Sequence, residues 1–96
     1  MRKSDFLLVD NSTASSAELW SGGTGTLLAY SSNWNTATAT FQISPDGTNF
    51  VGTGADGILS EDGSVNFSVP AGFSIKMVVS GTPTALYVRA VNNNKV

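Results

Sequence analysis

The amino-acid sequence predicts an all-β fold, an antiparallel β-sandwich or jelly-roll-like domain of about seven to eight short strands. The first observation is alternation. Apolar and polar residues alternate with a period of two, as in a half-buried strand, over residues 37–43, 65–69, 73–79 and 86–90. The second observation is that Gly, Pro, Asp and Asn separate these segments at the short spacing typical of sandwiches. No long segment has the helical period of an amphipathic helix.

The N-terminal residues differ in character from the rest, so we expect two parts, residues 1–23 and a β-sandwich domain over residues 24–96. Asp5 to Val9 predicts a short apolar strand, whereas Asn11 to Ser16 is a polar stretch without periodicity and is expected to be a loop. Two alternatives follow for the first part. It is either an arm that pairs with a neighbouring chain, or the first strand plus a linker of the same sandwich.

In the larger part, Thr26 to Tyr30 is the first expected strand and Thr36 to Ile43 is the clearest one. Pro45-Asp46-Gly47 predicts a turn, because Pro presets φ at the first corner and Gly tolerates positive φ. A return strand from Asn49 would complete a hairpin. Four alternate residues of the clearest strand share one face: Ala37, Ala39, Phe41 and Ile43.

Ala55-Asp56-Gly57 and Asp62-Gly63 predict two further turns, and three alternating strands follow them. The polar C-terminal tail from Asn92 is expected to fray. Eight positions on the apolar strand faces are expected to be buried: Phe41, Ile43, Phe67, Val69, Ile75, Met77, Leu86 and Val88.

The composition argues against several classes of function. The 96 residues contain no His and no Cys, which removes the usual general base, the usual metal ligands and the thiol nucleophile. The net charge is −2 and the five basic residues are scattered, so nucleic acid is not expected as a partner. No apolar stretch is long enough to span a membrane. We therefore expect no enzymatic activity and no cofactor.

The carboxylates do not change this expectation. Asp46, Asp56 and Asp62 each precede a Gly, where a short side chain bonds to its own backbone and tolerates the turn. Asp56, Glu61 and Asp62 lie close together and could offer oxygen ligands to calcium, but their spacing matches no calcium-loop motif. We interpret them as solvated turn residues, so no catalytic and no metal-binding residues are predicted.

The low charge suits a protein that packs against neighbours. Only 12% of the residues are charged, and Thr, Ser, Asn and Gly fill the polar positions instead. A Thr- and Ser-rich β protein without partners would have the same composition. Because sheet edges with few charges are poorly protected against pairing, we expect open edges to be covered by another copy or by a scaffold partner.

Trp20 and Trp34 lie near Gly, Ser and Asn residues in expected loops. Their rings could stack on sugars, but Trp in a small sandwich more often anchors the core or an interface. Five residues are therefore the candidates for a partner interface: Phe6, Leu7, Leu8, Trp20 and Trp34.

Four segments of the larger part carry a resemblance to a known class of proteins. They are Ser44-Pro45-Asp46-Gly47-Thr48-Asn49-Phe50, Asp62-Gly63-Ser64-Val65, Val69-Pro70-Ala71-Gly72 and Leu86-Tyr87-Val88-Arg89-Ala90. In this order they resemble small β-rich structural proteins of tailed bacteriophages, which decorate heads, form head fibres or knobs, or sit in tails. The similar region is residues 24–91, and the first 23 residues lie outside it.

The resemblance implies a non-catalytic virion protein, a capsid decoration, head-fibre or knob subunit attached by packing and strand pairing. Its implied partners are the major capsid protein or another virion protein, together with further copies of itself as a homo-oligomer. Neither nucleic acid nor a membrane is an implied partner. The alternative function is a carbohydrate-binding β-sandwich module, free or on a virion, that uses its loop tryptophans to bind a surface glycan.

Overall fold

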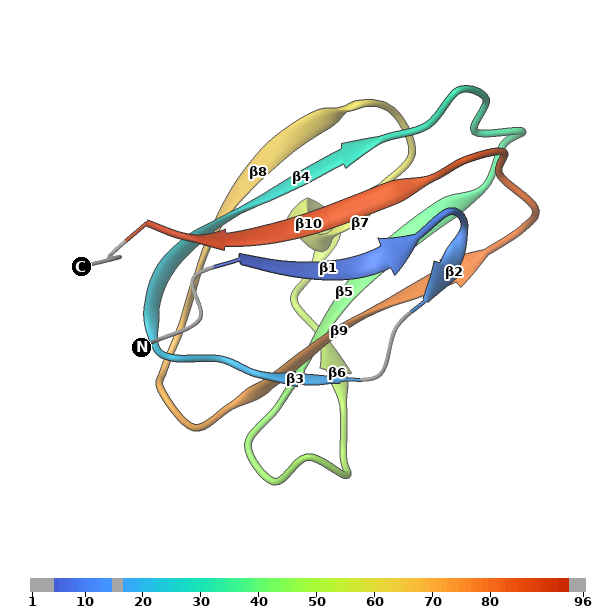
Figure 1. Ribbon diagram of the computed structural model, residues 1–96. Coiled ribbons are helices and arrows are strands. Elements are labelled where there is room, and N and C mark those ends of the chain that lie inside the picture. Colours follow the sequence, from blue (N-terminus) through green and yellow to red (C-terminus); the bar gives the residue numbers. More distant parts are fainter. Residues whose placement is uncertain (1–4, 15–16, 94–96) are drawn as a thin grey trace.

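The computed structural model describes residues 5–14 and 17–93, which form two antiparallel sheets packed face to face (Figure 1). Sheet A has the order β2 (Thr13–Ala14), β1 (Asp5–Asp10), β10 (Tyr87–Asn92), β4 (Gly23–Tyr30) and β8 (Gly63–Val69). Sheet B has the order β3 (Glu18–Leu19), β9 (Ser74–Ser80), β5 (Thr38–Ser44) and β6 (Val51–Gly52), and β7 (Ile58–Leu59) also pairs with β5. The expected antiparallel sandwich is confirmed.

The structure has more strands than expected because β2, β3 and β7 are two residues long, too short for alternation to predict them. β2 lies within the segment expected to be a loop, and the hairpin return strand begins at Val51 instead of Asn49. A short 3₁₀ helix, η1 (Ala55–Gly57), stands where one turn was expected. No helix in the described part of the chain is long and apolar enough to cross a membrane.

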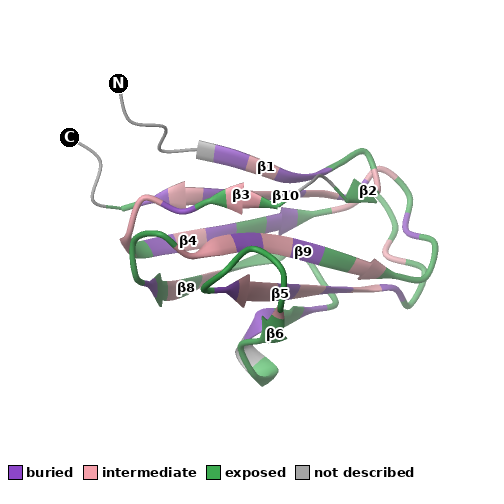
Figure 2. Ribbon diagram, turned by 90° about the horizontal axis from the view of Figure 1, so that it is seen from below, coloured by how far each residue is buried: buried purple, intermediate pink, exposed green. Residues whose placement is uncertain are grey.

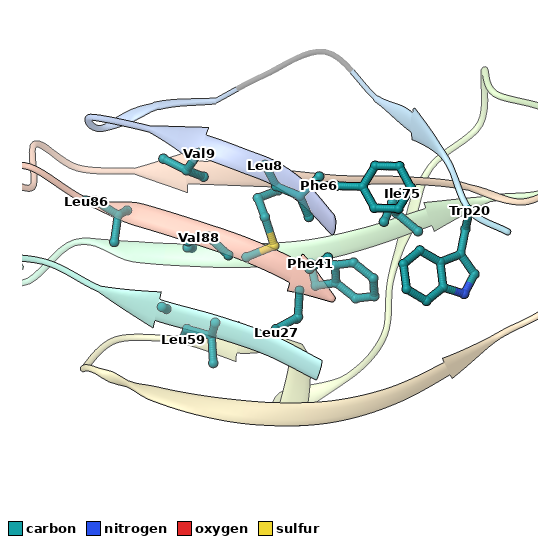
Figure 3. Packing of buried hydrophobic residues seen from close by; sticks show 14 of the residues in the cluster. Phe6, Leu8, Val9, Trp20, Leu27, Phe41, Leu59, Ile75, Leu86 and Val88 are labelled. Atoms are coloured by element: carbon teal, nitrogen blue, oxygen red, sulfur yellow. The ribbon is translucent and has the colours of Figure 1, made fainter. Parts of the chain in front are cut away.

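The core lies between the sheets: buried residues alternate with more exposed ones along the strands (Figure 2), and the buried side chains of both sheets pack together (Figure 3). Six of the eight expected core positions are buried, whereas Ile43 and Phe67 are half-buried. Both lie on the side of the sandwich where β8 forms the edge of sheet A, and they line a hollow of 230 Å³ between the sheets. Incomplete cover at that edge explains why these two residues keep some exposure.

The N-terminal segment is built into both sheets. β1 pairs with β10, placing Phe6 opposite Ala90, and β3 pairs with β9, placing Glu18 opposite Ile75. The Trp20 ring contacts Phe6 and Phe67, with ring centroids 5.6 and 5.0 Å apart. In the structure β1 and β3 are therefore strands of the same sandwich, as in the second alternative.

This placement corrects part of the expected interface. Phe6, Leu8 and Trp20 are 3%, 1% and 1% exposed, so their side chains already fill the core of their own chain and are not surface contacts for a partner. Gly25 of β4 makes the close packing possible, because a Cβ there would lie 2.5 Å from Phe67 and 2.8 Å from Trp20. A side chain at position 25 would therefore displace the rings.

The C-terminal end of the described chain is also ordered further than expected. Asn92 belongs to β10, is 2% exposed, and donates hydrogen bonds from Nδ2 to the Ser21 hydroxyl and the Gly22 carbonyl at 2.7 and 3.1 Å. The expectation of a frayed tail is thus wrong at Asn92, and residues 94 and 95 of that tail lie outside the described residues. These bonds tie the last strand to the loop that follows Trp20.

Candidate interaction surfaces

Asp46 organises the loop after β5. One carboxylate oxygen, Oδ1, accepts hydrogen bonds from the backbone N–H of Thr48 and of Asn49, both at 2.9 Å, and from the Ser44 hydroxyl at 2.7 Å. The other oxygen accepts from Asn49 Nδ2 at 2.9 Å. These bonds hold the pKa of Asp46 well below its ordinary value, and the bond from the Asn49 backbone N–H has the largest effect. Asp46 therefore acts as a turn residue, as expected.

Asp62 links two loops at one end of the sandwich. Its Oδ1 accepts hydrogen bonds from the Trp34 indole N–H at 2.8 Å and from the Ser31 backbone N–H at 2.9 Å. These bonds lower the pKa of Asp62, and the bond from the Trp34 indole N–H has the largest effect. Within residues 5–14 and 17–93, no group of three or more Asp and Glu side chains gathers where a metal ion could be held.

Trp34 lies at this same end, which we name the loop end, residues 31–36, 60–63 and 81–85. Its ring is half-buried and packs against the edge of the core. Asn35 Nδ2 donates to the Thr82 carbonyl at 2.9 Å and to the Thr84 hydroxyl at 3.2 Å. The loops are thus tied to one another, and the Trp34 indole N–H is already used within the chain.

A group of larger side chains lies on the outer face of sheet A, which faces away from sheet B. Leu28 and Tyr30 of β4 are each 44% exposed and lie opposite Arg89 and Tyr87 of β10. The two tyrosine rings stack, with centroids 5.4 Å apart and planes 23° apart. Leu7 of β1 lies opposite Arg89 on its other side. We name this surface the tyrosine face: Leu7, Leu28, Tyr30, Tyr87 and Arg89.

The outer face of sheet B differs from it. The central strand β5 presents Thr38, Thr40 and Gln42 there, and Lys76 of β9 lies opposite Gln42. Val78 and Ile58 flank Thr40, Leu19 of β3 lies opposite Ser74 and is 66% exposed, and Lys76 Nζ lies 4.2 Å from the centre of the Phe50 ring. No aromatic pair like Tyr30 and Tyr87 occurs among the outward residues of β5 and β9.

Of the five candidate interface residues, the structure brings one to the tyrosine face and one to the loop end. Leu7 is half-buried on the tyrosine face, Trp34 is half-buried at the loop end, and the other three are in the core. Sequence reasoning missed Tyr30 and Tyr87 because they lie at strand positions where the alternation predicts polar, outward-facing residues. The available signal was the pair Leu27-Leu28, where two consecutive apolar residues break the alternation.

Comparison with protein-family models, with curated proteins and with solved structures finds no match to this chain.

Proposed function

We propose that this chain is a non-catalytic structural subunit of a tailed-bacteriophage particle, attached through the tyrosine face. The observation that supports attachment is the cross-strand stack of Tyr30 and Tyr87 on an exposed sheet surface. Tyr and Arg are enriched in the cores of protein interfaces, because they bury much apolar area and still satisfy polar partners. The phage setting comes from the sequence resemblance.

The chemistry of the surface favours assembly over catalysis. The pKa is lowered for Asp46 and for Asp62, and both carboxylates are already engaged: Asp46 accepts bonds from donors of its own turn, and Asp62 accepts bonds from the Trp34 indole and the Ser31 backbone of another loop. A group held ionised by such bonds is a poor proton donor near neutral pH. The tyrosine face, by contrast, combines apolar area with hydroxyl and guanidinium groups on a rigid sheet, which suits packing against a protein surface.

Co-sedimentation with phage particles that lack the chain tests this proposal. The wild-type chain should bind, and the double variant Tyr30→Ala with Tyr87→Ala should bind at least tenfold more weakly. Binding should persist at raised salt, because buried apolar contacts are screened far less than surface ion pairs. Val51→Ala is the matched control, since Val51 is 60% exposed on β6, away from the tyrosine face.

Two results would count against the proposal. A wild-type chain that does not sediment with any particle removes the virion role. A double variant that binds as well as wild type, while circular dichroism shows an intact fold, moves the attachment surface elsewhere. Because both tyrosine side chains lie on the outer face, truncating them should leave the core unchanged.

Glycan binding at the loop end is the second candidate function. It is favoured by the half-exposed Trp34 ring, which lies between the exposed amide residues Asn33 and Asn35. A ring of this kind can stack on a sugar while amides bond its hydroxyl groups. A glycan array would test it, and the signal should disappear in Trp34→Ala but remain in the tyrosine-face double variant.

A further inference from the structure

The outer edge of β8 is the longest open sheet edge in the described chain. β8 pairs with β4 along all seven of its residues, Gly63 to Val69, and has no strand on its other side. The other edge strands, β2, β3, β6 and β7, have two residues each. β9 extends beyond β3, but β2 packs beside it there. β1 extends beyond β2 for four residues, from Asp5 to Leu8, so β8 offers the longest stretch of described backbone for pairing.

β8 also lacks the features that usually prevent edge pairing. Proteins protect an edge with a charged residue, a proline or a β-bulge. Residues 63–69 contain no charged residue and no proline, and their register with β4 is continuous from Gly63 opposite Ala29 to Val69 opposite Gly23. Three of the seven residues of β8, Val65, Phe67 and Val69, are of types that are enriched in strands. Neither a charge, nor a proline, nor a bulge therefore prevents another strand from pairing with this edge.

The backbone groups that face outward can be assigned from the neighbouring strands. The Thr24 carbonyl of β4 accepts a hydrogen bond from Asn93, so it points toward β10 and away from β8. Because backbone groups of successive residues point to opposite edges, Gly25 and its alternate neighbours point toward β8. Phe67, opposite Gly25, therefore points back toward β4. The outward groups of β8 then belong to Ser64, Asn66 and Ser68.

We propose that the β8 edge pairs with β8 of a second copy of this chain, antiparallel and centred on Asn66. In this register Asn66 lies opposite its own copy, and Ser64 lies opposite Ser68. All three outward-facing residues form hydrogen-bonded pairs, which gives about six backbone hydrogen bonds between the chains. Shifting the register by two residues in either direction loses one of these pairs or opposes Pro70, which has no N–H.

The side chains match in the same register. On the inner side Val65 lies opposite Phe67 of the partner, and both are half-buried in the single chain. They line the hollow of 230 Å³ between the sheets, so the partner strand would cover its mouth with apolar groups. On the outer side Asn66 already accepts a hydrogen bond from Thr26 at 2.9 Å, and a second Asn66 would extend this row of polar side chains. No like charges oppose one another along the pair.

This inference rests on the assembly role proposed above and specifies one partner for it. It concerns an edge strand and not the tyrosine face, so both surfaces can be used at once. A purified chain that binds particles but stays monomeric would overturn only the strand pairing. A chain that dimerises but binds no particle would count only against the attachment.

Measurement of molecular mass in solution over a range of concentrations is the first test, and it should show a dimer. Asn66→Lys should be monomeric, because two ammonium groups would meet at the centre of the pair, and Asn66→Glu should also be monomeric. A one-to-one mixture of these two variants should restore the dimer. Ser80→Lys is the matched control, since Ser80 is an exposed strand residue of sheet B. A wild-type chain that remains monomeric at every concentration overturns the proposal.

Cysteine cross-linking then tests the register, because the chain has no cysteine of its own. Asn66→Cys should form a disulfide-linked dimer under mild oxidation, as directly opposite Cα atoms lie about 5.5 Å apart. Ser64→Cys alone should not, because the two copies would lie about 14 Å apart, at four residues of strand rise. A mixture of Ser64→Cys with Ser68→Cys should cross-link. A dimer that cross-links through Ser64→Cys alone, or not at all, rules out this pairing.

Discussion

Trp20 and Trp34 both lie beside small polar residues or glycine in the sequence, Ser and Gly for Trp20 and Ser and Asn for Trp34, yet they occupy opposite environments. Trp20 is 1% exposed and lies between Phe6 and Phe67 in the core. Trp34 is half-buried at the loop end and bonds to Asp62. The difference shows that the residues next to a tryptophan in the sequence do not decide whether its ring is buried. Burial depends on whether a distant strand leaves room for the ring, as β4 does for Trp20 at Gly25.

The strongest test of this comparison is removal of residues 1 to 20. The deletion takes Phe6, Leu8, Val9 and Trp20 out of the core, and burial of each such side chain stabilises by about 1.5–3 kcal/mol. The total is comparable to the whole stability of a small domain, about 5–15 kcal/mol. We expect a chain without a cooperative thermal transition. A truncated chain that still melts cooperatively would show that the N-terminal segment is a dispensable arm.

Single substitutions at the two tryptophans come next in size. Trp20→Ala should cost about 3–5 kcal/mol in the free energy of unfolding, as expected for a large aromatic removed from a packed core. Trp34→Ala should cost clearly less, because its ring already contacts solvent. Urea denaturation of both variants measures the difference. Equal costs would mean that the loop end contributes to stability as much as the core does.

The space for the Trp20 ring can be tested from the opposite strand. Gly25→Ala should cost about 1–3 kcal/mol, because its Cβ would overlap Phe67 and Trp20. Gly52→Ala is the matched control, since a Cβ there would meet no atom within 4 Å. The control should change the urea midpoint little. If Gly25→Ala were equally neutral, Trp20 would not be held by close packing against β4.

The smallest effect concerns pH at the loop end. Since the Trp34 and Ser31 donors lower the pKa of Asp62 in the folded chain, their stabilisation is present above the unfolded pKa of about 3.9. It is lost as the pH falls through the lower, folded pKa. Trp34→Phe should therefore lower the melting temperature slightly at pH 7, and the difference from wild type should shrink below pH 4. Trp20→Phe serves as the control, because the decrease in melting temperature that this substitution causes should not depend on pH.

Alternation predicted the long strands well because β5, β8, β9 and β10 each expose one face of the sheet. It could not place the first strands, because the pairing of β1 with β10 joins residues at opposite ends of the chain. The tyrosine face escaped prediction for a different reason. Tyr30 and Tyr87 become neighbours only through the register of β4 and β10, and no local pattern contains that register.

The strands and turns that carry the candidate surfaces were therefore more predictable than the residues that meet on those surfaces. The turn role of Asp46 followed from its position before Gly47, since that chemistry is local. The bond between Asp62 and Trp34 joins loops 28 residues apart, so spacing alone gave no indication of it. Trp20 was placed among candidate surface residues because its partners, Phe6 and Phe67, are distant in the sequence.

The pairing of β1 with β10 also sets an order of events during synthesis. Asp5 lies opposite Val91, so β1 leaves the ribosome long before its partner β10 and must wait for it. Until β10 is available, β1 has no strand to pair with, and its apolar side chains stay exposed in the partly folded chain. Because pairing between such distant residues slows folding, we expect this sandwich to fold on the scale of milliseconds to seconds. A chaperone that binds the nascent chain would accordingly meet β1 before the other strands of this sandwich.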